Sequence, residues 1–267
     1  MDSRTLTEIW IYPIKSLAGI SLQKWEVNPK GLRFDRRWML VDEHGVFMTQ
    51  RTTTQMALFK TSLEGDTLTI SHSGDTLSVS LDQHPKGKAI ASQVWDDPVD
   101  VVEVDEKYST WFSEKLGTAC KLVSFPEKNK RAVDPTYIEG HEVSLADGYP
   151  FLIIGEQSLQ DLNNRLEKEI EMKRFRPNFV FSGGQPFEED TWRNFSIADV
   201  DFVGVKPCAR CVLTTIDPDT GNKGVEPLKT LATFRAKDNS ILFGQNLVAR
   251  NYGEIKVGDT LSINSTI

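Results

Sequence analysis

Cysteines and long apolar runs are scarce in this 267-residue sequence. Its three cysteines are an odd number for a chain of this length, which excludes the disulfide framework of a small secreted domain and favours a reducing compartment. No apolar run approaches the roughly 18 residues of a membrane span, and the N-terminal residues lack the pattern of a signal peptide. We therefore expect a cytoplasmic protein without a membrane partner.

Positive charge is also in short supply. The sequence has 31 lysines and arginines against 38 aspartates and glutamates, which gives a formal net charge of −7 and a pI near 5.3. A surface for a nucleic acid polymer needs clustered positive charge, so no such partner is expected. Hydrophobic residues make up 39% and charged residues 26%, a globular balance. At about 150 residues per domain, the chain would form one or two domains.

Alternating apolar residues separated by turn residues predict a mainly β protein with a few helices. We expect a strand within residues 6–14, a hairpin over 36–49 and a β-meander over 58–81 with turns at Gly65 and Gly74. Further strands are expected at residues 178–183, 200–205, 212–216, 241–249 and 254–263. Because several short strands must have their edges closed or covered, we expect a barrel in the second half.

Three segments predict helices instead. Between residues 106 and 116, aromatic and apolar side chains recur at helical spacing, and Gly117 can end the helix. Apolar residues spaced three or four apart predict a second helix over 159–170, with charges on its other face. A short third helix is expected at about 226–235.

A polar stretch over residues 126–142 predicts an exposed loop or linker. Just before it, Cys120 begins an apolar strand, where a buried and inert thiol is the expected state. We therefore expect an N-terminal β-domain of residues 1–120 and a β-barrel domain of residues 121–267.

The strongest local signal is a Cys-x-x-Cys motif formed by Cys208 and Cys211. A zinc site would need four ligands, yet no second such motif exists and the four histidines are scattered. A dithiol redox pair normally begins a helix, whereas the β-branched residues 212–216 predict a strand. A single functional thiolate, favoured by the charges of Lys206 and Arg210, is a third interpretation. Two buried, reduced cysteines without a function are the fourth.

Three further segments place cations beside unusual backbone residues. Residues 12–16 (YPIKS) end the first expected strand with a lysine and a hydroxyl, and residues 31–38 (GLRFDRRW) bring arginines to the start of another. Residues 175–178 (FRPN) combine an arginine, a proline and an amide side chain. An acidic protein that gathers cations in this way is expected to bind an anionic ligand, and arginine forks suit phosphate.

Together these segments resemble the MOSC family, the molybdenum-cofactor sulfurase C-terminal domain proteins. The nearest branch has two domains and includes the mitochondrial amidoxime-reducing component and the bacterial hydroxylaminopurine reductases. The resemblance extends from YPIKS (12–16) to EIKVGD (254–259), and its specific motifs are CARCVLTTIDPDTG (208–221) and ADGYPFLIIGEQSLQDLNNRL (146–166). It implies a MOSC N-terminal β-domain, whose first strands can complete a cofactor site, and a MOSC β-barrel.

The resemblance implies that a molybdenum cofactor, a pyranopterin dithiolene that holds the metal, binds to this chain. Cys211 would be the catalytic residue and the protein ligand of molybdenum, which takes soft sulfur ligands. The residues implied to hold the cofactor are Lys15, Ser16, Arg36, Arg176 and Asn178, with Gly148, Tyr149, Ala209 and Arg210 at its phosphate end.

The implied activity is the reduction of N-hydroxylated compounds, such as hydroxylaminopurines and amidoximes, to the corresponding N–H products. It would serve detoxification and would not require pyridoxal phosphate. The alternative is a protein that binds or carries the molybdenum cofactor without turning over a substrate. Both functions would need Cys211 and the surrounding cations.

Two departures from the family bear on the source of electrons. The mitochondrial members have an N-terminal membrane anchor, and some bacterial members have a C-terminal ferredoxin-like domain; we expect neither here, unless the chain is a fragment. Three cysteines could not ligate a four-cysteine cluster, and the sequence has no glycine-rich nucleotide loop. A separate electron-donor protein, with flavin or iron–sulfur groups, is therefore the expected partner.

Overall fold

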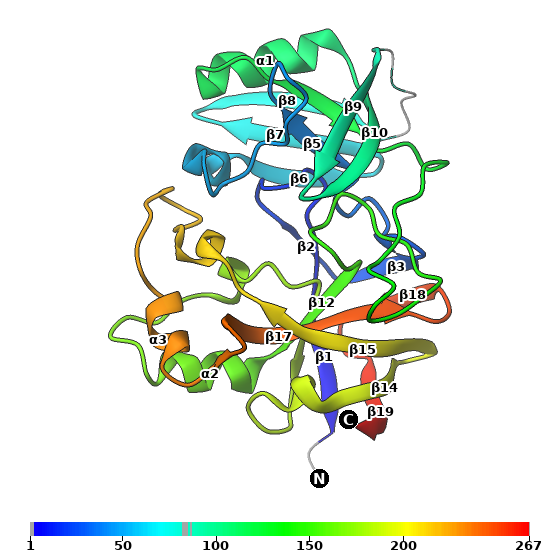
Figure 1. Cartoon of the computed structure of the whole chain (residues 1–267), viewed down its shortest axis with the longest axis vertical. Coiled ribbons are helices and arrows are strands. Elements are labelled where there is room, and N and C mark those ends of the chain that lie inside the picture. The colour runs from blue at the N-terminus through cyan, green and yellow to red at the C-terminus, as the bar shows by residue number, and fades with distance from the viewer. Residues whose placement is uncertain (1–2, 82–84, 86, 267) are drawn as a thin grey trace.

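The computed structural model describes residues 3–81, 85 and 87–266, and its central feature is a closed barrel (Figure 1). Seven strands follow one another around it: β12 (Phe151–Gly155), β13 (Phe179–Ser182), β1 (Arg4–Ile11), β19 (Thr260–Thr266), β14 (Trp192–Ile197), β15 (Val200–Ala209) and β17 (Ser240–Ala249). The barrel closes because β12 pairs in parallel with β13 and antiparallel with β17. The expected mainly β fold and its barrel are confirmed.

The first strand of the chain is part of this barrel. β1 runs antiparallel to β13, where Ile9 lies opposite Phe179, and both side chains are fully buried with Phe202 in the barrel core. Residues 12–16 therefore leave the barrel beside residues 175–178, which lead into β13. Each main chain fixes the other, since the Trp10 N–H donates to the Asn178 carbonyl at 2.8 Å.

The N-terminal half adds antiparallel sheets, seen above the barrel in Figure 1. A four-stranded sheet consists of β5 (Trp38–Val41), β11 (Lys121–Ser124), β10 (Asp97–Glu103) and β9 (Ala89–Val94). The expected meander is confirmed as β6 (Lys60–Glu64), β7 (Thr67–His72) and β8 (Asp75–Ser80). The remaining short strands are β2 (Ile20–Leu22), β3 (Lys24–Asn28), β4 (Gly31–Leu32), β16 (Ala236–Lys237) and β18 (Gly253–Lys256). Because β18 pairs with β3, the C-terminal part also contacts the N-terminal strands.

The hairpin expected over residues 36–49 is only partly formed. β5 pairs with β11 rather than with a full second strand, and a single bridge joins Val41 to Phe47. The Asp42 carboxylate accepts the N–H groups of His44 and Val46, both at 2.9 Å, and so closes the intervening turn.

The first helix agrees with its expected bounds. α1 (Glu106–Leu116) begins at Asp105, whose side chain accepts the Lys107 N–H, and ends at Gly117 with φ of 68°. Its buried face includes Tyr108 and Phe112, which pack against the N-terminal sheets. The amphipathic pattern predicted this helix because side chains three and four apart share one face.

The other helices are shorter than expected. α2 (Glu156–Asn163) ends early because the Asn163 side chain donates to the Ile170 carbonyl and accepts the Ile170 N–H. Leu166 and Ile170 still pack on the same core cluster, but from the segment after the helix. α3 (Leu228–Ala232) lies within the expected range. Short 3₁₀ turns span Thr54–Leu58, Met172–Arg174 and Glu188–Thr191.

The strand expected at residues 212–216 is wrong. Val212–Thr215 form a 3₁₀ turn, in which the hydroxyl of Thr214 donates to the Cys211 carbonyl and the hydroxyl of Thr215 donates to the Val212 carbonyl. Such local side-chain bonds compete with strand pairing. Cys211 therefore precedes a turn, not a strand.

The polar stretch over residues 126–142 is mostly exposed, as expected, but two of its side chains are buried. Arg131 and Val133 point inward, and a single bridge joins Ala132 to Glu142. The buried state expected for Cys120 is confirmed, and burial raises the pKa of its thiol.

Candidate functional site

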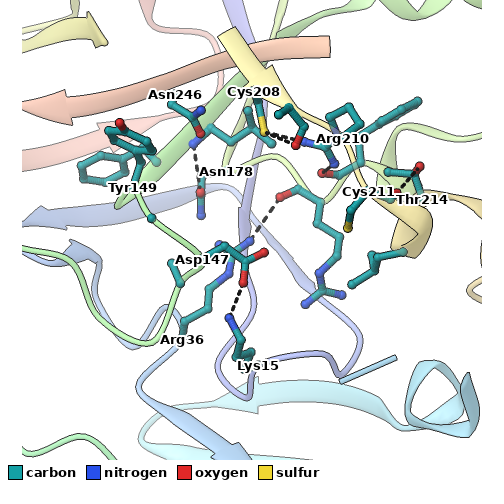
Figure 2. A pocket seen from close by; sticks show the side chains of 18 of the residues that line it. Lys15, Arg36, Asp147, Tyr149, Asn178, Cys208, Arg210, Cys211, Thr214 and Asn246 are labelled. Carbon is teal, nitrogen blue, oxygen red and sulfur yellow. Dashed lines mark hydrogen bonds and ion pairs between the residues drawn. The ribbon is translucent and has the colours of Figure 1, made fainter. Parts of the chain in front are cut away.

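A cavity of about 280 Å³ lies where the segments after β1, before β13 and after β15 meet the loop before β12 (Figure 2). Every residue that the sequence singled out lines it: Lys15, Ser16, Arg36, Gly148, Tyr149, Arg176, Asn178, Ala209, Arg210 and Cys211. These residues come from five separate places in the chain. Its volume lies near the lower end of the range for ligand pockets in known proteins, roughly 300–1,000 Å³.

Lys15 is buried in the wall of this pocket. Its ammonium donates to the Leu145 carbonyl at 2.8 Å and to the Asp147 carboxylate at 2.5 Å. Burial lowers the pKa of Lys15 more than the negative charge of Asp147 raises it. Burial also acts to raise the pKa of Asp147, but the charge and hydrogen bond of Lys15 outweigh it and hold that pKa below its usual range. Asp147 is therefore an anion at neutral pH.

Two arginines stack on one buried tyrosine ring. The guanidinium carbons of Arg36 and Arg176 lie 4.2 and 4.1 Å from the ring centroid of Tyr12. Arg36 forms an ion pair with Asp35 at 2.5 Å and donates to the Arg176 carbonyl at 3.2 Å. Arg176 donates to the Leu17 carbonyl at 2.7 Å, and burial lowers its pKa to about 10. The pair therefore presents fixed positive charge to the pocket.

The buried carboxylate of Asp35 holds the residues of this wall in place. It accepts the Tyr12 N–H at 2.7 Å, the Arg36 guanidinium at 2.5 Å and the Asn178 amide at 3.2 Å. The Asn178 side chain also accepts the Leu152 N–H at 3.2 Å. Arg36 and Asn178 are thus held in place by the same carboxylate.

Three of the predicted residues have a strained backbone conformation. Ser16, Arg36 and Arg176 adopt φ values of 68°, 47° and 56°, the left-handed region that residues other than glycine seldom occupy. Strain of this kind costs about 1–3 kcal/mol per residue and clusters at binding sites, where the surrounding structure maintains it. All three lie on the wall that also holds Lys15 and Asn178.

The two cysteines of the motif differ in their surroundings. Cys208 is partly buried, packs on the cluster that contains Phe175 and Phe243, and accepts a hydrogen bond from Arg210 at 3.1 Å. Cys211 is exposed, and its Sγ has no hydrogen-bond partner in the described part of the chain. Figure 2 shows the Cys208 sulfur beside Arg210 and the Cys211 sulfur apart from it.

The loop before β12 supplies the facing wall. The Arg131 guanidinium donates to the carbonyls of Ser144, Ala146 and Asp147, which fixes this loop from below. A Cβ on Gly148 would have no neighbour within 4 Å, so this residue leaves open space in the pocket. The buried hydroxyl of Tyr149 has no partner among the described residues, and burial raises its pKa above the usual range.

Several pocket residues were missed by the sequence argument: Thr49, Arg51, Asp147, Thr214 and Asn246. Asp147 and Thr214 belong to the two specific motifs, so a signal for them existed in residues 146–166 and 208–221. Arg51 follows the partly formed hairpin and Asn246 lies in the middle of β17. Nothing in their local pattern distinguishes them.

The charge of the pocket calls for an anion. Six cations line it, and the described residues provide ion-pair partners for Lys15 and Arg36 alone among them. The cations without such a partner are Arg51, Arg176, Lys206 and Arg210. Confined, uncompensated positive charge is costly unless a ligand neutralises it. The buried Nε of Arg210 also lacks an acceptor within the described chain. These residues fit an anionic group that carries a thiophilic metal toward Cys211.

A zinc site and a membrane-spanning helix find no support in the described ranges. No three His, Cys, Asp or Glu side chains gather there, whereas a structural zinc site needs four ligands, so the zinc interpretation lacks ligands. Over the same residues, no helix has the length and apolar character needed to cross a membrane.

Comparison with known proteins relates both halves of the chain to one family. The MOSC N-terminal beta barrel domain matches residues 3–119, and the MOSC domain matches residues 140–262. The mitochondrial amidoxime reducing component 2 of Rattus norvegicus is 36% identical over 276 residues, which cover 96% of this chain and 82% of that protein. This chain belongs to the MOSC family.

Two further relatives are an amidoxime-reducing component and a molybdenum cofactor sulfurase. The mitochondrial amidoxime-reducing component 1 of Homo sapiens is 36% identical over 275 residues, or 96% of this chain and 81% of that protein. The molybdenum cofactor sulfurase of Oryza sativa subsp. japonica is 31% identical over 280 residues, or 97% of this chain and 34% of that protein. Both MOSC matches contribute to the pocket, with Lys15 and Arg36 in the first and Arg176 and Cys211 in the second.

Proposed function

We propose that this MOSC protein is a molybdenum-cofactor-dependent reductase of N-hydroxylated compounds. The observation that carries the proposal is the meeting of the Cys211 thiol with unpaired cations in one pocket. It is supported by relatives named for amidoxime reduction that align over nearly the whole chain. The reaction consumes two electrons and two protons: an amidoxime R–C(=NOH)NH₂ becomes the amidine R–C(=NH)NH₂, and water is released.

We assign the cofactor to the residues whose chemistry fits it. The Cys211 thiolate would be the soft ligand of molybdenum. Arg176 and Arg36, which are fixed by the Tyr12 ring, would neutralise the anionic pterin, and Arg210 would bind its phosphate through the unpartnered Nε. When bound, the cofactor supplies the two-electron chemistry, and the protein contributes orientation and electrostatics.

Asp147 is a hydrogen-bond acceptor of the pocket and Lys15 is a proton donor. Asp147 engages Lys15 through Oδ1, and Figure 2 shows its other carboxylate oxygen turned away from that contact. As a permanent anion at neutral pH, this oxygen can accept an N–H of the substrate and orient it. The Lys15 ammonium lines the same pocket and holds a proton at Nζ, and its lowered pKa favours release of that proton.

We further propose that electrons come from a separate protein with flavin or iron–sulfur groups and that the enzyme acts in the cytoplasm. The cytoplasm is supported because a chain with so few cysteines suits a reducing compartment. The separate donor is supported because the three thiols of this sequence cannot hold a four-cysteine cluster beside the Cys211 site. Nicotinamide alone would therefore be an inadequate donor.

One experiment tests the function against a cofactor carrier. The protein is purified from a host that makes the cofactor, its molybdenum and zinc contents are measured, and benzamidoxime is added with a reduced viologen dye as donor. We expect about one molybdenum per chain, because one thiolate ligates one metal, and stoichiometric formation of benzamidine. Replacing the dye with NADH should stop turnover until a flavin or iron–sulfur reductase is added. Molybdenum without product would favour the carrier, and zinc at full occupancy without molybdenum would refute both.

A further inference from the structure

Arg51 is a pocket cation to which no role has yet been assigned. Its Nε donates to the Thr49 hydroxyl at 3.3 Å, and no carboxylate lies within ion-pair distance of it in the described part of the molecule. An arginine has five N–H donors, so most of those on Arg51 lack a protein acceptor. The guanidinium is nevertheless fixed, because its carbon lies 3.9 Å from the ring centroid of Trp95 and 5.8 Å from that of Phe47.

Trp95 reaches this position from the tight turn between β9 and β10. Its φ is 57°, a strained value for a bulky residue, and 41% of its surface is exposed. The indole packs edge-to-face on Phe47 with centroids 6.1 Å apart, and its Nε1 donates to Asp147 Oδ1 at 3.1 Å. Through these contacts, Trp95 brings the turn of the N-terminal sheet to the rim of the pocket.

The Trp95 indole therefore positions a donor, Arg51, and an acceptor, Asp147, that do not form an ion pair with each other. Asp147 has its ion-pair partner in Lys15, and the described residues show no ion pair between Asp147 and Arg51. Both cations lie near the Phe47 ring, with Lys15 Nζ 5.7 Å and the Arg51 guanidinium carbon 5.8 Å from its centroid. Arg51 can donate to a ligand while Asp147 accepts from it.

We propose that Arg51, positioned by Trp95, is a specificity-determining residue that selects N-hydroxylated compounds with an amidine-type N–C–N unit. In such a unit one nitrogen carries an N–H and the other a lone pair, which match Asp147 and Arg51. Amidoximes and hydroxylaminopurines both contain it. A simple arylhydroxylamine has only one nitrogen on the carbon, so it lacks the second nitrogen that would accept from Arg51 while an N–H donates to Asp147. This inference rests on the proposed function and adds the selection of its substrate.

The position of Arg51 favours a substrate contact over a cofactor contact. Arg36 and Arg176, which are assigned to the cofactor, stack on Tyr12, which is 1% exposed, whereas Arg51 stacks on a tryptophan that is 41% exposed. A substrate arrives from solvent and must pass this rim. A site that hydrogen-bonds its substrate discriminates against analogues that lack the partner group.

The test compares two substrates in the molybdenum-loaded protein with a viologen donor. Benzamidoxime contains the N–C–N unit and N-phenylhydroxylamine does not. We expect Arg51→Met to lower the ratio of kcat/KM for benzamidoxime over N-phenylhydroxylamine about tenfold, chiefly through KM, and Trp95→Ala to act in the same direction. Trp95→Phe retains a ring for stacking and should lower the ratio less. The matched control is Arg165→Met, which removes a guanidinium stacked on Phe234 at 4.2 Å outside the pocket and should leave the ratio unchanged.

A binding measurement makes the result independent of turnover. Benzamidoxime is titrated calorimetrically into oxidised holoprotein without an electron donor, and Arg51→Met should weaken its binding about tenfold. An unchanged Kd and an unchanged ratio would overturn the inference even if both substrates are reduced. Loss of molybdenum from Arg51→Met would also overturn it, because Arg51 would then hold the cofactor. If wild-type protein binds benzamidoxime through Arg51 but reduces neither substrate, the proposed function fails and the binding site stands.

Discussion

The two cysteines of the Cys-x-x-Cys motif are expected to respond differently to replacement with alanine. Cys208→Ala should lower stability and keep activity, whereas Cys211→Ala should keep stability and lose activity. Cys208 is partly buried and accepts a hydrogen bond from Arg210, so Cys208→Ala leaves a small cavity and an unpaired donor. The combined cost is about 1 kcal/mol, which lowers the Tm by about 2–4 °C for a chain of this size. Cys211 is exposed, so Cys211→Ala should change the Tm of cofactor-free protein by less than about 2 °C.

Activity should change in the opposite sense. Cys211→Ala removes the proposed metal ligand, and benzamidoxime reduction per bound molybdenum should fall more than about 100-fold, beyond the 10–100-fold typical of residues that only support a ligand. Cys208→Ala should retain at least half of the wild-type rate and its molybdenum.

The two variants are assayed together by differential scanning calorimetry without cofactor and by viologen-coupled turnover with it. An equal loss of activity in both would restore the paired-thiol interpretations. A loss confined to Cys208→Ala would mean that the wrong sulfur had been assigned to the metal.

Two further predictions concern buried charge. Arg176→Ala should lower molybdenum per chain about tenfold with little loss of Tm, because this guanidinium has no carboxylate partner among the described residues. Lys15→Ala should also lower molybdenum but cost more stability, since it leaves a cavity and deprives the buried Leu145 carbonyl of its lysine donor. Equal molybdenum in Arg176→Ala and wild type would exclude a cofactor contact. Burial raises the pKa of Glu189 to about 7 from an ordinary 4.5, so the stability present below pH 4.5 should decline by about 3 kcal/mol between pH 4.5 and pH 7 and then level off. Glu189→Gln should remove this decline in urea unfolding from pH 5 to pH 8, and an unchanged slope would contradict it.

The fold was predictable wherever local pattern and tertiary pairing agree. The alternation over residues 58–81 and the aromatic spacing over 106–116 each matched one structural period, and both elements formed as expected. The strand prediction for residues 212–216 was wrong because β-branched residues favour strands only where a partner strand is present. Here the hydroxyls of Thr214 and Thr215 bond to nearby carbonyls instead.

The pocket residues also differ in whether the sequence could predict them. Lys15, Arg176 and Cys211 were predictable because they lie in short motifs whose residue types suit a metal and an anion. Arg51 was not predictable, since its role depends on Trp95, which is 44 positions away in the sequence and meets it only through the turn between β9 and β10. No periodicity encodes such a contact between separate elements.

The position of β1 in the barrel has a consequence for how the protein is made. Arg4 pairs with Leu261, so the barrel cannot close on the ribosome until nearly the entire chain has been synthesised. Until then, β1 can pair with β13 but lacks its other barrel neighbour, β19, and contacts this distant in sequence form slowly. A fragment that starts after residue 120 would lack β1 and expose the edges of β13 and β19, which are sites for aggregation. The same cut removes Lys15 and Ser16, so the two halves cannot be produced apart without losing both the closed barrel and one wall of the pocket.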